Sequence, residues 1–186
     1  MNIKLVSSKR KRKFALMRWS IFSLIIWFTF IFMTTGSFTK PEILIPLALC
    51  ISMSEDELVS AVTGIFCGLL NDIALGKLIG YNAILLLLGC VCTSLLFTHL
   101  LRKSFLNIFI LTIFYSSICF LLDYFFYYVI WDYSNTDILL KKFMLPEFLL
   151  TIFSLIIIYP FIKFIRKHFT LRKMHTLNEN DALIKD

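Results

Sequence analysis

The sequence lacks the short motifs that accompany nucleotide, metal or nucleophile chemistry. It contains no G-x-x-x-x-G-K-[ST], no G-x-G-x-x-G and no H-E-x-x-H. The three histidines, His99, His168 and His175, have no cysteine or aspartate at ligand spacing. We therefore expect no catalytic residues, no metal site and no cofactor, and we predict that the chain is not an enzyme.

The cysteines of the chain also form no pattern that indicates a disulfide framework. The chain has five cysteines, an odd number, and no C-x-x-C pair. All five lie inside apolar segments, where a free thiol packs as a small hydrophobic group. There is no internal repeat and no linker long enough to separate two domains, so we expect one folded unit.

Apolar residues, by contrast, are abundant. They make up 59% of the 186 residues, against roughly 45–50% in a typical soluble domain, and the mean hydropathy is +0.82. Charge is segregated into the two ends and the short gaps between apolar runs. The net charge of +7 could indicate nucleic acid, but basic residues beside hydrophobic segments favour an anionic inner leaflet instead. We predict a membrane protein with several spans and no nucleic-acid partner.

The apolar runs predict an all-α membrane protein, a polytopic bundle of six transmembrane helices. The expected spans are 14–35, 38–53, 58–75, 81–101, 105–128 and 144–165. They form one transmembrane domain, 14–165, between a basic cytoplasmic arm, 1–13, and a cytoplasmic polar tail, 166–186. Segment 38–53 is short for a span and contains Pro41 and Pro46, so it is either a short span or a re-entrant hairpin.

Loop charges favour six spans. With six, both termini lie on the cytoplasmic side of the cell membrane, together with most of the lysines and arginines. The outer side then holds Lys40, Lys77, Lys141 and Lys142. The loop 132–142 is expected outside. If segment 38–53 did not span, the basic tail would lie outside and the charge bias would nearly vanish.

The stretch 54–81 is the most patterned part of the chain. We expect a helix that starts at Ser54, with Glu57 three residues later, and stops at Gly76. One face is small and polar, and the opposite face is large and apolar. The first face consists of Ala61, Gly64, Gly68, Asn71 and Asp72, and the second of Val62, Phe66, Leu69, Leu70 and Ile73. In lipid the large face should meet acyl chains, while the glycine face lets another helix approach closely.

Three acids fall in or beside the expected spans, namely Asp72, Asp123 and Glu147. The six-span orientation places all three near the outer leaflet. A carboxylate inside a membrane indicates function by default. The alternative is that each reaches interfacial water or a lysine such as Lys77. Both interpretations stay open for Asp72 and Asp123, and the interfacial one is favoured for Glu147.

The order of these features resembles the MreD family of bacterial rod shape-determining proteins. The resemblance rests on a basic start with Arg18-Trp19, a short proline-bearing second segment and the stretch Gly64, Gly68-Leu69-Leu70-x-Asp72, Gly76, Gly80. It covers nearly the whole chain, although the last two helices match only as hydrophobic spans. The long loop 132–142 and the extended basic arm depart from the family pattern.

The resemblance implies a non-enzymatic scaffold of the cell-elongation complex, which supports peptidoglycan synthesis and cell shape. Its partners would be the bitopic protein MreC, the MreB cytoskeleton and the RodA/transpeptidase synthase. The family fold is similar to the substrate-binding subunits of energy-coupling-factor transporters, and such a subunit is the alternative function. We expect Gly64, Gly68, Asn71, Asp72, Gly76, Gly80 and Asp123 to serve partner binding or helix packing. In this hypothesis Asp72 and Asp123 offer acceptors to MreC.

Overall fold

The computed structural model describes residues 2–35, 41–126 and 145–182, with side chains described for 17–35, 41–126 and 145–165. These parts contain six helices. They are α1 (Asn2–Thr35), α2 (Leu44–Ser52), α3 (Glu57–Leu75), α4 (Tyr81–His99), α5 (Phe105–Tyr124) and α7 (Leu145–Ala182). The predicted outer loop 132–142 and the end of the predicted fifth span lie outside the described residues.

Five of the six helices are long and apolar enough to cross a membrane, which confirms a helical membrane protein. In α1 and α7 the apolar portions are Met17–Thr35 and Leu145–Ile165. The exception is α2, because its nine residues extend only about 14 Å, against roughly 30 Å of bilayer hydrocarbon. The sequence predicted a short second segment, and the helix within it is shorter still.

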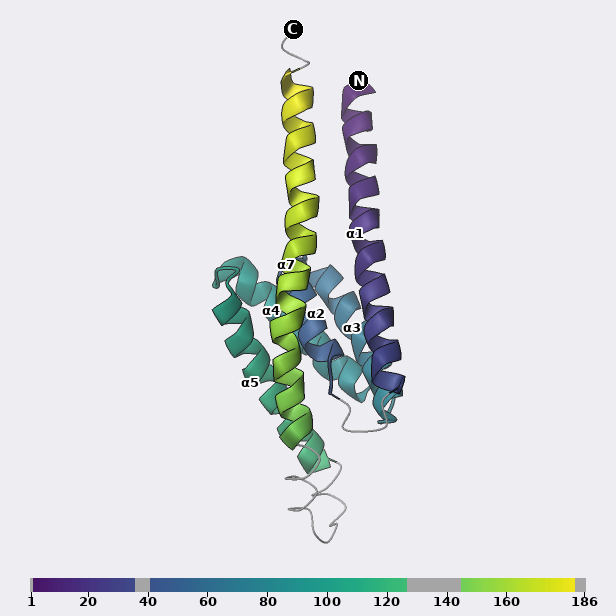
Figure 1. Ribbon diagram of the computed structural model, residues 1–186, viewed down its shortest axis with the longest axis vertical. Helices are drawn as coiled ribbons and strands as arrows, with labels where there is room; N and C mark the ends of the chain where they lie inside the picture. The colour runs from purple at the N-terminus through teal and green to yellow at the C-terminus, as the bar shows by residue number, and fades with distance from the viewer. Residues whose placement is uncertain (1, 36–40, 127–144, 183–186) are drawn as a thin grey trace.

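The helices alternate in direction between the two ends of the bundle. Figure 1 shows both termini at the same end. From there α1 leads away, α2 returns, α3 leads away again, and α4, α5 and α7 continue the alternation. We call the end that carries the termini the terminal end and the opposite one the distal end. Although α2 is short, the chain enters it from the distal end and leaves it toward the terminal end.

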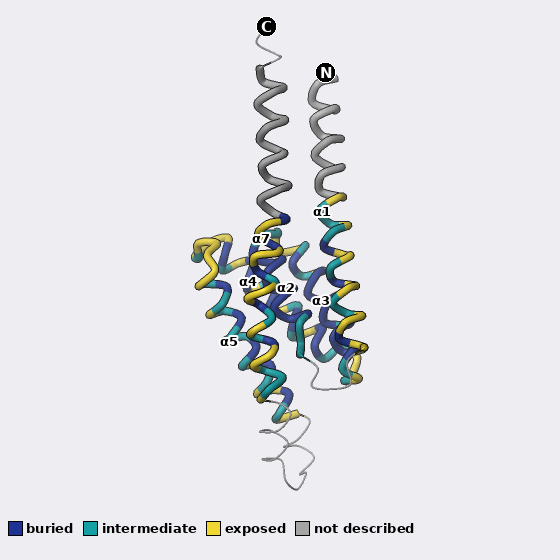
Figure 2. Tube along the Cα trace, viewed as in Figure 1, coloured by how far each residue is buried: buried dark blue, intermediate teal, exposed yellow. Residues whose placement is uncertain are grey.

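The core of the bundle is built around α2. All nine of its residues are buried, and it packs against α3, α4 and α7; Figure 2 shows it enclosed at the centre. A helix of this length has little stability alone, so packing must supply it. Pro46 is tolerated because it lies in the first turn, where its missing N–H has no helical partner.

The outer faces of the long helices are apolar and exposed. Examples are Phe28 of α1, Phe114 of α5 and Ile157 of α7. In water such a surface would aggregate, whereas acyl chains solvate it as well as a protein core would. Exposure of this kind on several helices is consistent with a chain that lipid surrounds.

The predicted start of the third helix is wrong. Helix α3 begins at Glu57, and Asp56 occupies the N-cap position. Ser54 instead belongs to the turn that ends α2, where its N–H donates to the carbonyl of Ile51 at 3.1 Å. The predicted stop is confirmed, because Gly76 follows the last helical residue in the left-handed conformation, with φ of 66°.

Candidate functional site

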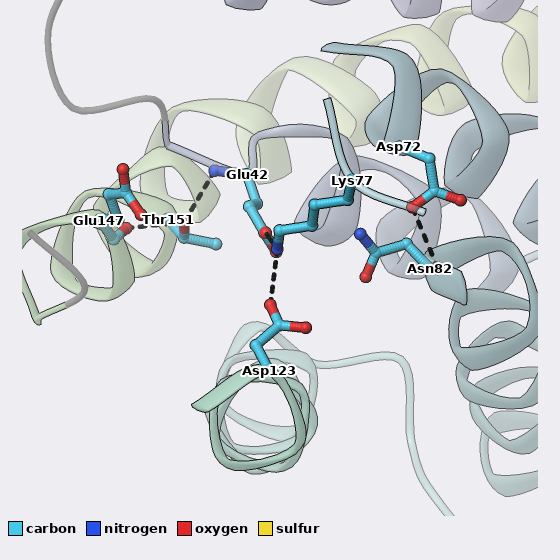
Figure 3. A network of polar contacts seen from close by, with 7 residues as sticks. All are labelled: Glu42, Asp72, Lys77, Asn82, Asp123, Glu147 and Thr151. Atoms are coloured by element: carbon cyan, nitrogen blue, oxygen red, sulfur yellow. Dashed lines mark hydrogen bonds and ion pairs between the residues drawn. The ribbon is translucent and has the colours of Figure 1, made fainter. Parts of the chain in front are cut away.

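A cluster of charged side chains joins three elements at the distal end. The ammonium of Lys77, in the turn between α3 and α4, lies 2.7 Å from Oε1 of Glu42 and 2.6 Å from Oδ2 of Asp123. Glu42 lies two residues before the start of α2, and Asp123 is in the last turn of α5. Figure 3 shows both carboxylates directed at Lys77. We call these three residues the Lys77 cluster.

The turn that carries Lys77 is fixed by two glycines and one aspartate. Gly76 and Gly80 both have positive φ, 66° and 99°, which glycine adopts without strain. The Asp72 carboxylate accepts hydrogen bonds from the backbone N–H groups of Gly80, at 2.7 Å, and Asn82, at 3.1 Å. These groups belong to the start of α4, where a negative charge is stabilised by the helix dipole. Asp72 therefore ties the end of α3 to the beginning of α4.

The environment of Lys77 favours its charged form. Burial alone would lower the pKa of Lys77, but Glu42 and Asp123 outweigh burial and raise it above its ordinary value of 10.5. The ammonium is therefore charged at neutral pH. Two carboxylates thus share this one ammonium.

Glycines on α3 allow it to lie directly against α4, and this pair of helices has the most extensive contact in the described bundle. A Cβ atom on Gly68 would lie 2.4 Å from the Cα of Ala83, and one on Gly64 would lie 2.7 Å from the Leu86 carbonyl oxygen. Both contacts are with backbone, which cannot move aside as a side chain can. These two positions therefore set the separation of the helices.

The two predicted faces of α3 are largely found in the structure. Gly64, Gly68, Asn71 and Asp72 are buried, while Val62, Phe66 and Ile73 are exposed. Leu70 departs from the pattern: it was predicted on the lipid side but is buried. Its side chain belongs to the apolar core around α2, because α2 packs against a second side of α3 in addition to the side that α4 covers.

The predicted site residues differ in position and surroundings. Gly64 and Gly68 lie in the middle of α3, whereas the others lie toward the distal end. Asp72 is fully buried, and its two oxygens accept backbone hydrogen bonds, so the hypothesis that it offers an acceptor to a partner gains no support from this geometry. Asp123 belongs to the Lys77 cluster. Glu147 lies apart on α7, where its carbonyl accepts a hydrogen bond from Thr151, whose hydroxyl in turn accepts the N–H of Glu42 (Figure 3).

Sequence reasoning did not identify Glu42 and Lys77 as site residues. The sequence offers Lys77 as an interfacial partner for an acid but gives no role to Glu42. A usable signal was present, because Lys77 is a lone cation between two glycines and has several acids near its predicted depth. Which acids it pairs with depends on where α2 and α5 lie, and that is a property of the tertiary structure.

A second ion pair lies toward the terminal end. Arg18 of α1 lies 2.7 Å from Oε1 of Glu55, which follows α2. The Glu55 carbonyl accepts a hydrogen bond from the Ser94 hydroxyl of α4 at 2.8 Å. The short α2 is thus anchored by charge on both sides, by Glu42 at one end and Glu55 at the other.

The chemistry of the site is that of binding and packing. Within 17–35, 41–126 and 145–165 no three side chains of histidine, cysteine, aspartate or glutamate gather to hold a metal ion. The charged groups that meet at the Lys77 cluster neutralise one another and join separate helices. Such an arrangement fixes the shape of the distal end.

Comparison with known proteins identifies the family. A family model described as rod shape-determining protein MreD matches residues 9–168, which include every apolar helix of the bundle. No significant match is found among curated proteins or solved structures. Since the match covers nearly all of the chain, the protein belongs to the MreD family of rod shape-determining membrane proteins.

Proposed function

We propose that this chain is a scaffold of the cell-elongation complex, which binds an MreC-like bitopic protein and thereby supports the control of peptidoglycan synthesis. The observation that carries the proposal is the family match across the whole helical bundle. MreB and a RodA/transpeptidase synthase would be further members of the same complex. In this role the chain positions proteins relative to one another and catalyses no reaction.

The proposed orientation places both termini in the cytoplasm and the distal end outside. It is supported by the arrangement of the helices, which brings the two basic ends of the chain to the same side. Positive residues are retained on the cytoplasmic side of bacterial membrane proteins. In this orientation α2 completes a sixth crossing inside the bundle, shielded from lipid by its neighbours.

The turn 76–80 is our candidate surface for the partner. Its backbone is held by Asp72, and Lys77 is fixed by two carboxylates. Between these anchors the turn exposes two large apolar side chains, Leu78 at 61% and Ile79 at 75% of their full accessible area. A rigid turn with apolar side chains at the outer surface would suit a protein such as MreC, whose larger part faces the same side.

Site-specific photocrosslinking tests this proposal. A photoreactive amino acid is placed at Ile79, and a matched control is placed at Leu58, in the first turn of the same helix α3. Leu58 is at least as exposed, at 83%, but it lies toward the terminal end. We expect adducts with a tagged MreC-like protein from Ile79 and few from Leu58. Adducts from Leu58 alone, or from neither position when both proteins are present in the membrane, would overturn the proposed surface.

A further inference from the structure

The lysines and arginines whose side chains the structure describes divide into two groups. Arg18 and Lys77 form ion pairs with carboxylates at 2.6–2.7 Å, and these pairs hold the two ends of α2. The side chains of Arg102, Lys103 and Lys163 are exposed and pair with no acid of the described residues. The second group is therefore available to an anion that is not part of the chain.

The three unpaired cations lie at the same end of two neighbouring helices. Arg102 and Lys103 stand in the turn just before α5, and Lys163 lies in the last turn of the apolar portion of α7. Helix α5 begins at the terminal end, α7 leads toward that end (Figure 1), and the two helices pack on each other. The cations thus mark one edge of the apolar bundle, at the depth of lipid headgroups.

Aromatic contacts connect Lys163 to the start of α5. Phe105 is the first residue of α5, and its ring packs on that of Tyr159 in α7, with the centroids 4.9 Å apart. The ammonium of Lys163 lies 5.7 Å from the centroid of the same Tyr159 ring, which is within the range of a cation–π interaction. Lys163 is therefore held on the side of α7 that the start of α5 contacts.

The turn that carries the other two cations is ordered by hydrogen bonds. The carbonyl of Arg102 accepts the N–H of Ser104 at 2.7 Å and the side-chain Nδ2 of Asn107 at 3.0 Å. The backbone of Arg102 and Lys103 is thus tied to the first turn of α5. Together with the aromatic contacts, this brings the three cations to one place, and we call Arg102, Lys103 and Lys163 the α5–α7 basic patch.

The described acids lie away from the α5–α7 basic patch. Helix α5 and the apolar portion of α7 contain one acid each, Asp123 and Glu147, and both are at the distal end. Asp56 and Glu57 are exposed at the terminal end, but they belong to the start of α3, which packs on α4, α2 and α1. The patch is therefore positive without a neutralising side chain on either of its own helices.

The surface beside the patch indicates a lipid and not a soluble anion. Leu106 and Ile110 follow one another along α5 from the turn toward the membrane interior, and they are 66% and 62% exposed. A phospholipid can place its phosphate against lysine and arginine and its acyl chains along such side chains. We propose that the α5–α7 basic patch binds the headgroup of an anionic phospholipid, as a specific site beyond the general attraction of a basic chain to the cytoplasmic leaflet. The choice of leaflet rests on the proposed orientation, whereas the binding itself does not.

Photoactivatable phospholipids test the site on the full chain in nanodiscs. Two probes carry the same diazirine-labelled acyl chain. One has a phosphatidylglycerol headgroup, which is anionic, and the other has a phosphatidylethanolamine headgroup, which is zwitterionic. Adducts are located by mass spectrometry of peptides. Leu58 provides an internal control, because it is 83% exposed at the same end of the bundle but adjoins the acid Glu57.

We expect at least about tenfold more adducts at Leu106 and Ile110 from the phosphatidylglycerol probe than from the phosphatidylethanolamine probe, and no such preference at Leu58. Equal labelling by the two probes, or the same preference at all three residues, would overturn the site. Inorganic phosphate should leave the preference unchanged relative to chloride at equal ionic strength. If phosphate removes it, the patch binds a free anion and the assignment to lipid is wrong.

Two triple variants separate the patch from the overall charge of the chain. They are Arg102→Gln/Lys103→Gln/Lys163→Gln in the patch and Arg172→Gln/Lys173→Gln/Lys185→Gln in the tail. The patch variant should lose the preference for phosphatidylglycerol, and the tail variant, which removes the same charge, should keep it. Equal loss in both would show that net charge is responsible and would overturn the site. If the patch variant does not fold, the comparison with Leu58 in the unmodified chain still decides the question.

Single variants of Lys163 test the contribution of α7. Lys163→Gln should lower the preference about fivefold, and Lys163→Arg should retain it because the charge is kept. A preference that is unchanged in Lys163→Gln would contradict a site shared by α5 and α7. None of these measurements involves MreC, so failure of the lipid site and failure of the proposed scaffold function can be told apart.

Discussion

Replacing Gly68 by alanine should destabilise the bundle more than any other single methyl group added to α3 or its turn. The added Cβ would lie 2.4 Å from the Cα of Ala83, whereas ordinary contacts begin near 3.4 Å. The helices would have to separate by about 1 Å along their closest contact. Overpacking of this kind costs about 1–3 kcal/mol, and a clash between two backbones belongs at the upper end.

A matched control is available on the same helix. Gly76→Ala adds the same methyl group where nothing lies within 4 Å, so its cost comes only from the positive φ of 66°, or about 1 kcal/mol. The variants are heated in detergent, and the fraction of protein that stays monodisperse is measured by size-exclusion chromatography. The temperature at which half of that fraction is lost ranks their stability. We expect the midpoint temperature to fall more for Gly68→Ala than for Gly76→Ala. Equal midpoints, or the reverse order, would refute the close α3–α4 packing.

Three further predictions concern the distal end. Lys77→Met leaves Glu42 and Asp123 without their shared cation and should lower the free energy of unfolding by about 2–4 kcal/mol, reduced from the fully buried value because Lys77 is partly exposed. Lys77→Arg keeps the positive charge and should retain most of the stability of the parent, and a Met variant as stable as the parent would contradict the ion pairs. The folded-state pKa of Lys77 is raised, so the stability that Lys77 contributes is present below the ordinary pKa of 10.5 and is lost as the pH rises through the folded-state pKa. Unfolding midpoints measured above pH 10.5 should therefore fall more steeply for the parent than for Lys77→Met. Parallel curves would argue against a raised pKa of Lys77. Asp72→Asn removes one acceptor from the start of α4 and should lower the free energy of unfolding by about 1–3 kcal/mol. Hydrogen exchange at the N–H of Gly80 should become faster, and unchanged exchange there would argue against the hydrogen bonds from Asp72 to the start of α4.

The sequence predicted much of this fold because membrane helices leave strong signals. Long apolar runs bounded by charge located the five long helices, and the small residues of α3 predicted its close packing. Gly76 was found as a helix stop because its left-handed conformation is one that glycine favours. Each of these features follows from local composition or from spacing along a single helix.

Other features depended on contacts between distant segments. Ser54 looked like a helix start, but the turn that ends α2 incorporates it. Leu70 looked lipid-facing, because nothing in α3 reveals that α2 covers a second side of it. The pairing of Lys77 with Glu42 and Asp123 joins positions 35 and 46 residues apart, and no helical periodicity relates them.

The most direct test of the central claim is the shape of cells depleted of this protein. Cell length and width are measured during depletion and after the chain is expressed again from a second copy. If the protein supports rod shape, depleted cells should become rounder, and the parent chain should restore rods. Depleted cells that keep their length and width while the protein is undetectable would contradict the account.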